Sequence, residues 1–250
     1  KLSKYLPDFP RGEEVTVHHL LTHTSGIHSY TNQPDFASVS TMAIEPEELI
    51  RSFKNDRFDF DPGQKFLYNN SGYFLLGQII EKVSGLSYAE YLRKTFFEPL
   101  GMKNSGVHVA RDIIEGEACG YAWEGRVRKA PSWDMSRAGG AGALYSTIDD
   151  LYLWNEALFG GKVLSGASLK AATTPVLTTE DEGYGYGLAI GELRGQRSIS
   201  HGGGLAGFRS NLLRLPDRRF SVVVLVNSAP NVPGLDPGTL SDEIAELFLG

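Results

Sequence analysis

The hydrophobic residues in the first two thirds of the chain recur every three or four positions, which is the spacing of an amphipathic helix. The stripe formed by Leu151, Trp154 and Leu158 predicts a helix with one face in the core. Pro99 is expected to end another helix, and residues 103–137 are rich in glycine and polar residues and are predicted to be irregular. Ser87 with Glu90, and Ser146 with Asp149, have the spacing of capping boxes at helix starts. With these caps and glycine stops, the spacing predicts further helices over residues 17–22, 47–54, 72–83, 87–97 and 168–173.

From about residue 184 the hydrophobic pattern changes to a period of two, which is typical of strands. Strands are predicted over residues 184–190, 198–201, 208–215 and 220–226, and a last helix over 241–249. We therefore expect an α+β fold. Residues 1–172 should form a mainly helical region, and residues 173–250 should form an antiparallel sheet flanked by helices.

One stretch with candidate chemistry lies just before the predicted helix over residues 72–83. Tyr68 and Asn70 stand two residues apart there, so both side chains can project into one cleft. A phenol can give and take a proton, and a carboxamide can hold a polar substrate group. The same tripeptide also fits a half-buried tyrosine beside an asparagine helix cap, and the sequence alone leaves both interpretations open.

Composition narrows the possible partners. The 250 residues contain 24 Lys and Arg against 30 Asp and Glu, and the resulting net charge of −6 argues against a nucleic-acid partner. The chain contains no apolar run of about 18 residues, so we expect no membrane-spanning helix. Cys119 is the single cysteine, which excludes an internal disulfide.

Several reactive residue types have simpler explanations than catalysis. His19 and His23 are four residues apart, but no glutamate follows the first histidine as in a His-Glu-x-x-His zinc motif, so we expect them to pack between domains and expect no metal site. Cys119 has no recognisable base, and Ser25 precedes a glycine where a helix should stop. No cofactor is expected.

Ordered segments along nearly the whole chain carry a family resemblance. They are LLTHTSG at residues 20–26, Tyr68-Asn69-Asn70, EPLGM at residues 98–102, residues 140–150 with Trp154, His201-Gly202-Gly203, and the strand that Asn227 closes. With these segments the chain resembles the serine β-lactamase and penicillin-binding-protein superfamily, in its class C β-lactamase-like branch. The resemblance implies a β-lactamase-like fold and an acyl-enzyme mechanism on a small ester, amide or lactam substrate.

The resemblance also implies roles for individual residues. Tyr68 would be the proton shuttle, and Asn70 would bind substrate and orient a lysine. His201 would be the first residue of the third motif. The N–H of Gly204 would be one oxyanion donor and the N–H of the nucleophilic serine the other, and Gly203 would belong to the same oxyanion- and substrate-binding segment. Tyr30 lies in a loop that borders the pocket in this family and is a further substrate-contact candidate. A periplasmic or secreted location is plausible by resemblance, whereas oligomeric state is not readable.

The chain departs from the family pattern at two points. Ser-x-x-Lys, the family's nucleophile motif, does not occur in these 250 residues, so we expect either a chain that lacks its N-terminal segment or an inactive relative that binds a peptide or cell-wall ligand. His201 stands where class C β-lactamases carry lysine. Histidine is a weaker and pH-dependent cation, which favours esterase or peptidase activity over β-lactamase activity.

Overall fold

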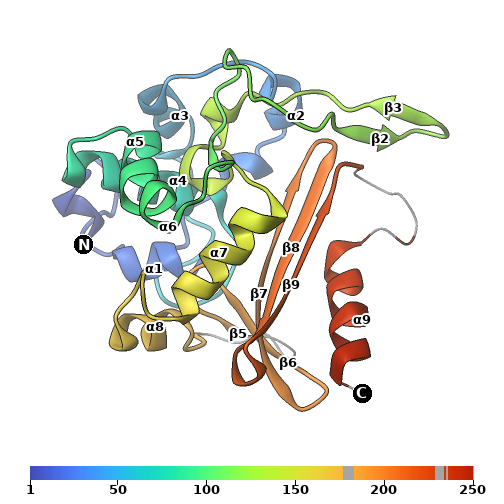
Figure 1. Ribbon diagram of the computed structural model, residues 1–250. Helices are drawn as coiled ribbons and strands as arrows, with labels where there is room; N and C mark the ends of the chain where they lie inside the picture. Colours follow the sequence, from blue (N-terminus) through green and yellow to red (C-terminus); the bar gives the residue numbers. More distant parts are fainter. Residues whose placement is uncertain (177–182, 229–233, 235, 250) are drawn as a thin grey trace.

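The computed structural model describes residues 1–176, 183–228, 234 and 236–249. Its largest sheet has five antiparallel strands in the order β5-β6-β7-β8-β9, so neighbours in the sheet are also neighbours along the chain (Figure 1). The strands are β5 (Gly183–Tyr184), β6 (Ala189–Leu193), β7 (Gln196–Leu205), β8 (Phe208–Leu215) and β9 (Phe220–Val226).

Two strand predictions were wrong in extent. The alternation over residues 184–190 belongs to two strands, because the chain turns between β5 and β6 through Gly187, whose φ is +69°. The strand predicted over residues 198–201 continues through its three glycines to Leu205. Gly203 pairs with Ser210 of β8 and Gly204 with Arg209, and this pairing outweighs the weak strand propensity of glycine.

Helices cover both faces of the sheet. Helix α9 (Pro237–Leu249) packs its Ala245 against Leu213 and Leu215 of β8. Helix α7 (Ile148–Phe159) contacts β9, and Figure 1 shows α7 and α9 on opposite sides of the sheet. No strand among the described residues pairs with the outer side of β9 along its length, so β9 is the edge of the sheet as described.

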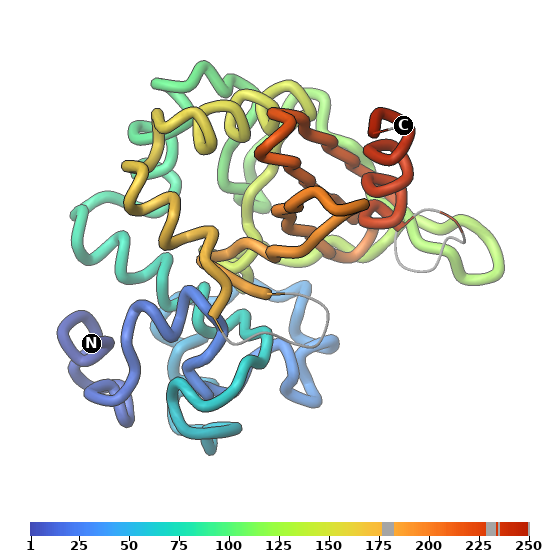
Figure 2. Tube along the Cα trace, turned by 90° about the horizontal axis from the view of Figure 1, so that it is seen from below, coloured from blue at the N-terminus to red at the C-terminus, as the bar shows by residue number. Residues whose placement is uncertain are grey.

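The helical region is built around α4 (Asn70–Ser84). Phe74 and Leu75 of this helix pack with Leu20 and Phe53 in a buried core. Figure 2 shows this region, coloured blue to cyan, on one side of the molecule and the orange and red strands on the other. The other helices of this part are α1 (Val17–Leu21), α2 (Phe36–Val39), α3 (Pro46–Phe53), α5 (Tyr88–Leu92), α6 (Glu98–Leu100) and α8 (Gly166–Ala172).

Pro99 does not end the helix that begins with α5. Residues Arg93–Phe97 form a π-helical turn in which the N–H of Glu98 donates to the carbonyl of Arg93, five residues back. The chain then continues as α6, and Gly101, with φ +74°, is the C-cap. The wider turn accommodates a proline whose ring would clash with the carbonyl four residues earlier in a regular α-helix.

Capping predictions hold in one place and shift in another. Ser87 and Glu90 form the expected capping box before α5. The cap of α7 is Thr147, one residue later than a box from Ser146 to Asp149 would require. The carboxylate of Asp150 accepts hydrogen bonds from outside the helix instead, namely from the N–H of Asn104 and the hydroxyl of Ser105.

The stretch predicted to be irregular contains short strands. Strand β1 (Gly106–Val107) pairs with β4 (Leu144–Tyr145), and β2 (Tyr121–Trp123) pairs with β3 (Val127–Lys129). In Figure 1 the β2–β3 hairpin projects from the body of the molecule. Segments of two or three residues are too short to show a period of two, which explains why the sequence did not reveal them.

The two regions interlock. The carbonyl of Ala172 in α8 accepts a hydrogen bond from the N–H of Tyr186, and α7 packs on β9. The division into residues 1–172 and 173–250 therefore stays a prediction, which describes where helices and strands occur along the chain. Among the described helices, none is both long enough and apolar enough to cross a membrane.

Candidate active site

A buried histidine lies where the helical region meets the sheet. Thr16 caps α1 by accepting a hydrogen bond from the N–H of His19, and the chain leaves this helix in a left-handed conformation at His23, with φ +56°. His23 is 1% exposed. It is therefore beyond the end of α1 and does not share a helix face with His19. Its position between the two regions agrees with the expectation of a packing role.

The N-terminus of α4 lies against this histidine. Asn69 is the N-cap, because its side chain accepts from the N–H of Gly72, and its own N–H donates to Nδ1 of His23 at 3.0 Å. The helix-cap interpretation is therefore right for Asn69. The ring of Tyr68 lies 4.2 Å from that of His23 between centroids, and 45% of the residue stays exposed.

The sheet brings His201 to the same place. The ring centroids of Tyr68 and His201 are 6.2 Å apart, although 133 positions separate them in the sequence. Nε2 of His201 lies 3.0 Å from the hydroxyl of Tyr184, and this hydroxyl lies 3.1 Å from Nε2 of His23. Four rings from four segments thus form one cluster, and Tyr68 is its exposed member.

Burial sets the charge of this cluster. It lowers the pKa of His23 to about 3, with a further contribution from the nearby charge of His201. It also lowers the pKa of His201, and it raises the pKa values of Tyr68 and Tyr184. All four rings are consequently neutral near pH 7. His201 does not supply the positive charge that Tyr68 would need to act as a base.

Asn70, the first residue of α4, is held by polar side chains of an earlier loop. Its Nδ2 donates to the hydroxyl of Thr31 at 3.0 Å, and its N–H donates to the hydroxyl of Ser29. With Nδ2 engaged in this way, the carbonyl oxygen Oδ1 is the end of the carboxamide that can accept from a lysine or from a substrate N–H.

The glycines after His201 lie on the part of β7 that extends past β6. Pairing between β6 and β7 ends at Ala189 and Ser200, so Gly203 and Gly204 pair only with β8. A Cβ on Gly203 would lie 2.6 Å from the hydroxyl oxygen of Ser210. A side chain at this position would therefore force the Ser210 hydroxyl to move.

Tyr30 lies in the core of the helical region. It is 3% exposed, its ring stacks on Phe53 with centroids 6.0 Å apart, and its hydroxyl donates to the carbonyl of Arg137. A side chain buried and paired in this way has no surface to offer a substrate. We therefore leave Tyr30 out of the proposed site, contrary to the expectation from its loop.

Sequence reasoning missed Tyr184 as part of the site. Its position in an alternating run indicated only a strand, and nothing in that pattern points to a hydroxyl held between two imidazoles. His23 was expected to be a packing residue, which it is, but its hydrogen bonds to Asn69 and Tyr184 also connect the two regions.

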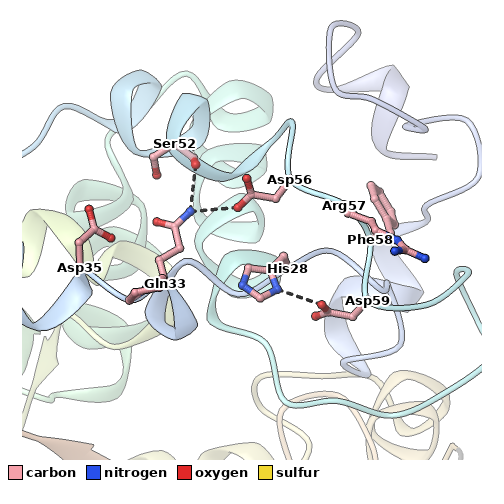
Figure 3. Close-up of a pocket in the computed structure, with 9 residues that line it drawn as sticks. His28, Gln33, Asp35, Ser52, Asp56, Arg57, Phe58 and Asp59 are labelled. Carbon is pink, nitrogen blue, oxygen red and sulfur yellow. Dashed lines mark hydrogen bonds and ion pairs between the residues drawn. The ribbon is translucent and has the colours of Figure 1, made fainter.

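A surface hollow of about 810 Å³ lies elsewhere, on loops of the helical region (Figure 3). His28 contacts Asp59 at 2.9 Å there, and Gln33 donates to Asp56 at 3.0 Å. None of the cluster rings lines this hollow. Among the described residues, no group of three or more His, Cys, Asp or Glu side chains could hold a metal ion.

Similar proteins of known structure share this fold. A D-stereospecific amidohydrolase from Streptomyces sp. superposes with a TM-score of 0.86 at 28% identity, covering 100% of this chain and 78% of that one. The D-amino acid amidase from Ochrobactrum anthropi SV3 gives a TM-score of 0.87 at 26% identity, covering 99% and 75%. The β-lactamase-like fold expected from the sequence is thereby confirmed.

Sequence comparison gives the same relationship. Penicillin-binding protein 4* of Bacillus subtilis (strain 168) is 31% identical over 247 residues, covering 91% of this chain and 54% of that protein. The chain thus spans about half the length of the curated relatives that it matches. The sequence model described as Beta-lactamase matches residues 1–246. The chain therefore belongs to the beta-lactamase family, within the superfamily of serine β-lactamases and penicillin-binding proteins.

Proposed function

We propose that this chain is part of a serine hydrolase that cleaves amides or esters through an acyl-enzyme. The observation that carries the proposal is the exposed Tyr68 ring, 6.2 Å from His201 at the meeting point of α4 and β7 in a member of this family. The names of two similar structures, an amidohydrolase and an amidase, make amides of D-amino acids the first substrates to test.

In the proposed reaction Tyr68 moves the proton. A serine hydroxyl attacks the substrate carbonyl, Tyr68 receives the hydroxyl proton through its oxygen and passes it to the leaving group, and water then cleaves the acyl-enzyme. Since burial raises the pKa of Tyr68, a nearby cation must lower it, so that Tyr68 gives up its own proton to solvent and accepts the serine proton as a phenolate. A lysine oriented by Oδ1 of Asn70 would provide that charge.

The backbone of β7 would stabilise the oxyanion. Gly203 and Gly204 lie on the part of β7 that β6 does not cover, which leaves their edge available to a substrate carbonyl. A donor of this kind is worth about 10²–10³ in rate in a serine hydrolase. His201 lies beside Tyr68, and burial lowers its pKa, so it is neutral there. A neutral side chain favours amide or ester substrates over lactams whose carboxylate would pair with a permanent cation.

The nucleophile is proposed to be encoded upstream of Lys1 in a Ser-x-x-Lys motif. The first experiment is to read the coding sequence upstream of Lys1. The extended protein should then release amine from D-amino-acid amides. Intact-mass spectrometry should detect an acyl adduct on that serine, and a serine-to-alanine variant should lose both signals. If no Ser-x-x-Lys is encoded, the hydrolase proposal fails. A non-catalytic peptide or cell-wall binder would then be the better explanation, and it should bind such ligands without an adduct.

A further inference from the structure

Two buried side chains and one half-buried side chain form a continuous line of hydrogen bonds between the two regions of the molecule. The line begins at the N–H of Asn69, passes through His23, Tyr184 and His201, and ends at the carbonyl of Gly202. Its four distances are 3.0, 3.1, 3.0 and 2.6 Å. Both ends are backbone groups whose roles are fixed, because an N–H only donates and a carbonyl only accepts.

The backbone donor at one end determines the tautomer of His23. Nδ1 of His23 accepts from the N–H of Asn69, so it carries a lone pair and not a proton. The ring proton is then on Nε2, which donates to the hydroxyl oxygen of Tyr184. This tautomer agrees with a buried, neutral imidazole whose pKa is about 3.

The carbonyl at the other end determines the tautomer of His201. Nδ1 must carry the proton to donate to the carbonyl of Gly202, which leaves a lone pair on Nε2 of the neutral ring. The hydroxyl of Tyr184 therefore donates to Nε2 of His201 while it accepts from His23. All the hydrogens of the line then point from Asn69 toward Gly202.

We propose that Tyr184 is a positioning residue, which holds His201 as the Nδ1–H tautomer so that His201 fixes the Gly202 carbonyl instead of exchanging protons with Tyr68. A second proton on Nε2 would turn that nitrogen into a donor. The hydroxyl of Tyr184 would then face two donors, and its own hydrogen would have to turn from His201 to the hydroxyl oxygen of Tyr73, its other side-chain partner. Both ring nitrogens of His201 are used within the line, so neither is available to a ligand.

The line has a consequence for the glycine segment. The carbonyl of Gly202 and the N–H of Gly203 belong to one planar peptide unit and point in opposite directions. Pairing with β8 already constrains this unit, because Gly202 faces Asn211 and Gly203 faces Ser210, and the contact from His201 adds to that constraint on the carbonyl and on the next N–H. The value of this orientation for oxyanion binding rests on the proposed function, whereas the tautomers do not depend on it.

The groups that face His201 belong to three elements. They are Tyr184 of β5, Tyr68 before α4, and His23 after α1, and all three are neutral between pH 5 and 8 for the reasons given above. Loss of the Tyr184 hydroxyl would remove a bond that only neutral His201 can accept. The pKa of His201 should then rise by about half a unit to one unit, as expected for one neutral hydrogen bond.

The test is long-range ¹H–¹⁵N NMR of the histidine rings in the purified protein, with assignments from His23→Gln and His201→Gln. In the wild type, Nδ1 of His201 and Nε2 of His23 should give signals of protonated nitrogen, and the other nitrogen of each ring should give a signal of a lone-pair nitrogen. Tyr184→Phe should move the Nε2 signal of His201 toward that of an unbonded nitrogen and raise its pKa.

Tyr186→Phe is the matched control, because the hydroxyl of Tyr186 also contacts an imidazole nitrogen, Nδ1 of His18 at 2.9 Å, but outside the line. It should leave the signals of His23 and His201 in place. A proton on Nε2 of His201 in the wild type would overturn the proposal, even if Tyr184→Phe failed to fold. The proposal would also be overturned if Tyr184→Phe and Tyr186→Phe gave the same His201 nitrogen signals. The NMR test does not depend on hydrolysis. A protein that shows these tautomers but does not hydrolyse amides or esters would therefore refute the proposed function and leave the role of Tyr184 intact.

Discussion

The guanidinium of Arg214 in β8 pairs with the carboxylate of Glu156 in α7, which joins the sheet to a helix from the earlier part of the chain. The two ends of this pair differ in exposure. The Arg214 side chain is 6% exposed and the Glu156 side chain 43%. Arg214 also donates to the hydroxyl of Ser221 at 2.8 Å, whereas its Nε is buried without a hydrogen-bond partner.

Because the cation is the buried partner, removal of Glu156 should be costly. Glu156→Gln leaves the charge of Arg214 in the interior without a counterion, and we expect the free energy of unfolding to fall by about 1–3 kcal/mol. The measurement is urea unfolding. Glu246→Gln, in the exposed pair with Arg194, should change stability by no more than about 0.5 kcal/mol. Equal effects of the two substitutions would show that burial of Arg214 is unimportant.

The protein should also be sensitive to a side chain added where two glycines pack closely together. A Cβ added to Gly77 of α4 would lie 3.2 Å from both the nitrogen and the Cα of Gly140. Gly77→Ala should therefore destabilise the protein by about 1–3 kcal/mol, because backbone has to move. Gly166→Ala in α8 meets nothing within 4 Å and should be neutral or stabilising by up to about 1 kcal/mol. Thermal unfolding of both variants tests this contrast, which would be refuted by an unaffected Gly77→Ala protein.

His23 should make stability depend on pH in the acid range. Its pKa is lowered from 6.5 to about 3, so between these values the unfolded chain binds a proton that the folded protein does not. Stability therefore increases with pH in this window and is lost on acidification, with a slope of up to about 1.4 kcal/mol per pH unit from this group. The measurement is urea unfolding at several pH values.

Two variants isolate this contribution. His23→Gln should be less stable at pH 7 but should show a flatter pH dependence than the wild type. His18→Gln, which removes an exposed imidazole from α1, should retain the wild-type slope. The prediction is wrong if the slope of His23→Gln matches that of the wild type.

Tyr68→Phe should separate catalysis from folding. The Tyr68 ring is half exposed, so loss of the hydroxyl should change stability by less than about 0.5 kcal/mol. In the extended protein with its proposed nucleophile, kcat for amide hydrolysis should fall by about 10²–10⁴, the usual contribution of a positioned acid or base. Tyr152→Phe on the exposed surface of α7 should retain full activity. Hydrolysis that survives Tyr68→Phe would assign the proton transfer to another group.

Local signals in the sequence were sufficient to predict most helices. They failed where the extent of an element depends on pairing with a residue that is distant in the sequence. Ser87 and Glu90 are three residues apart, so their capping box could be read directly. The extension of β7 through Gly203 could not, because it depends on pairing with Ser210 of β8. Glycine disfavours a strand by itself, and the cross-strand partner overrides that preference.

The candidate site was predictable only through its motifs. Tyr68 and His201 were identified by the segments that contain them, and the fold brings their rings together. The link through Tyr184 joins residues 161 positions apart at one end and 17 at the other, and no local pattern encodes such a contact. The orientation of Asn70 likewise depends on Thr31, which is 39 positions away.

The π-helical turn at Arg93–Phe97 amounts to one extra residue inserted into an otherwise continuous helix. Deleting a single residue there would restore four-residue spacing and rotate everything that follows by about 100° about the helix axis. Pro99 would then face the carbonyl that the bulge now moves aside. Phe97 and Met102, which share a buried cluster with Leu92, would turn away from it. Homologous chains that lack this π-helical turn should therefore be one residue shorter here. They should also differ at the positions of Pro99, Phe97 and Met102.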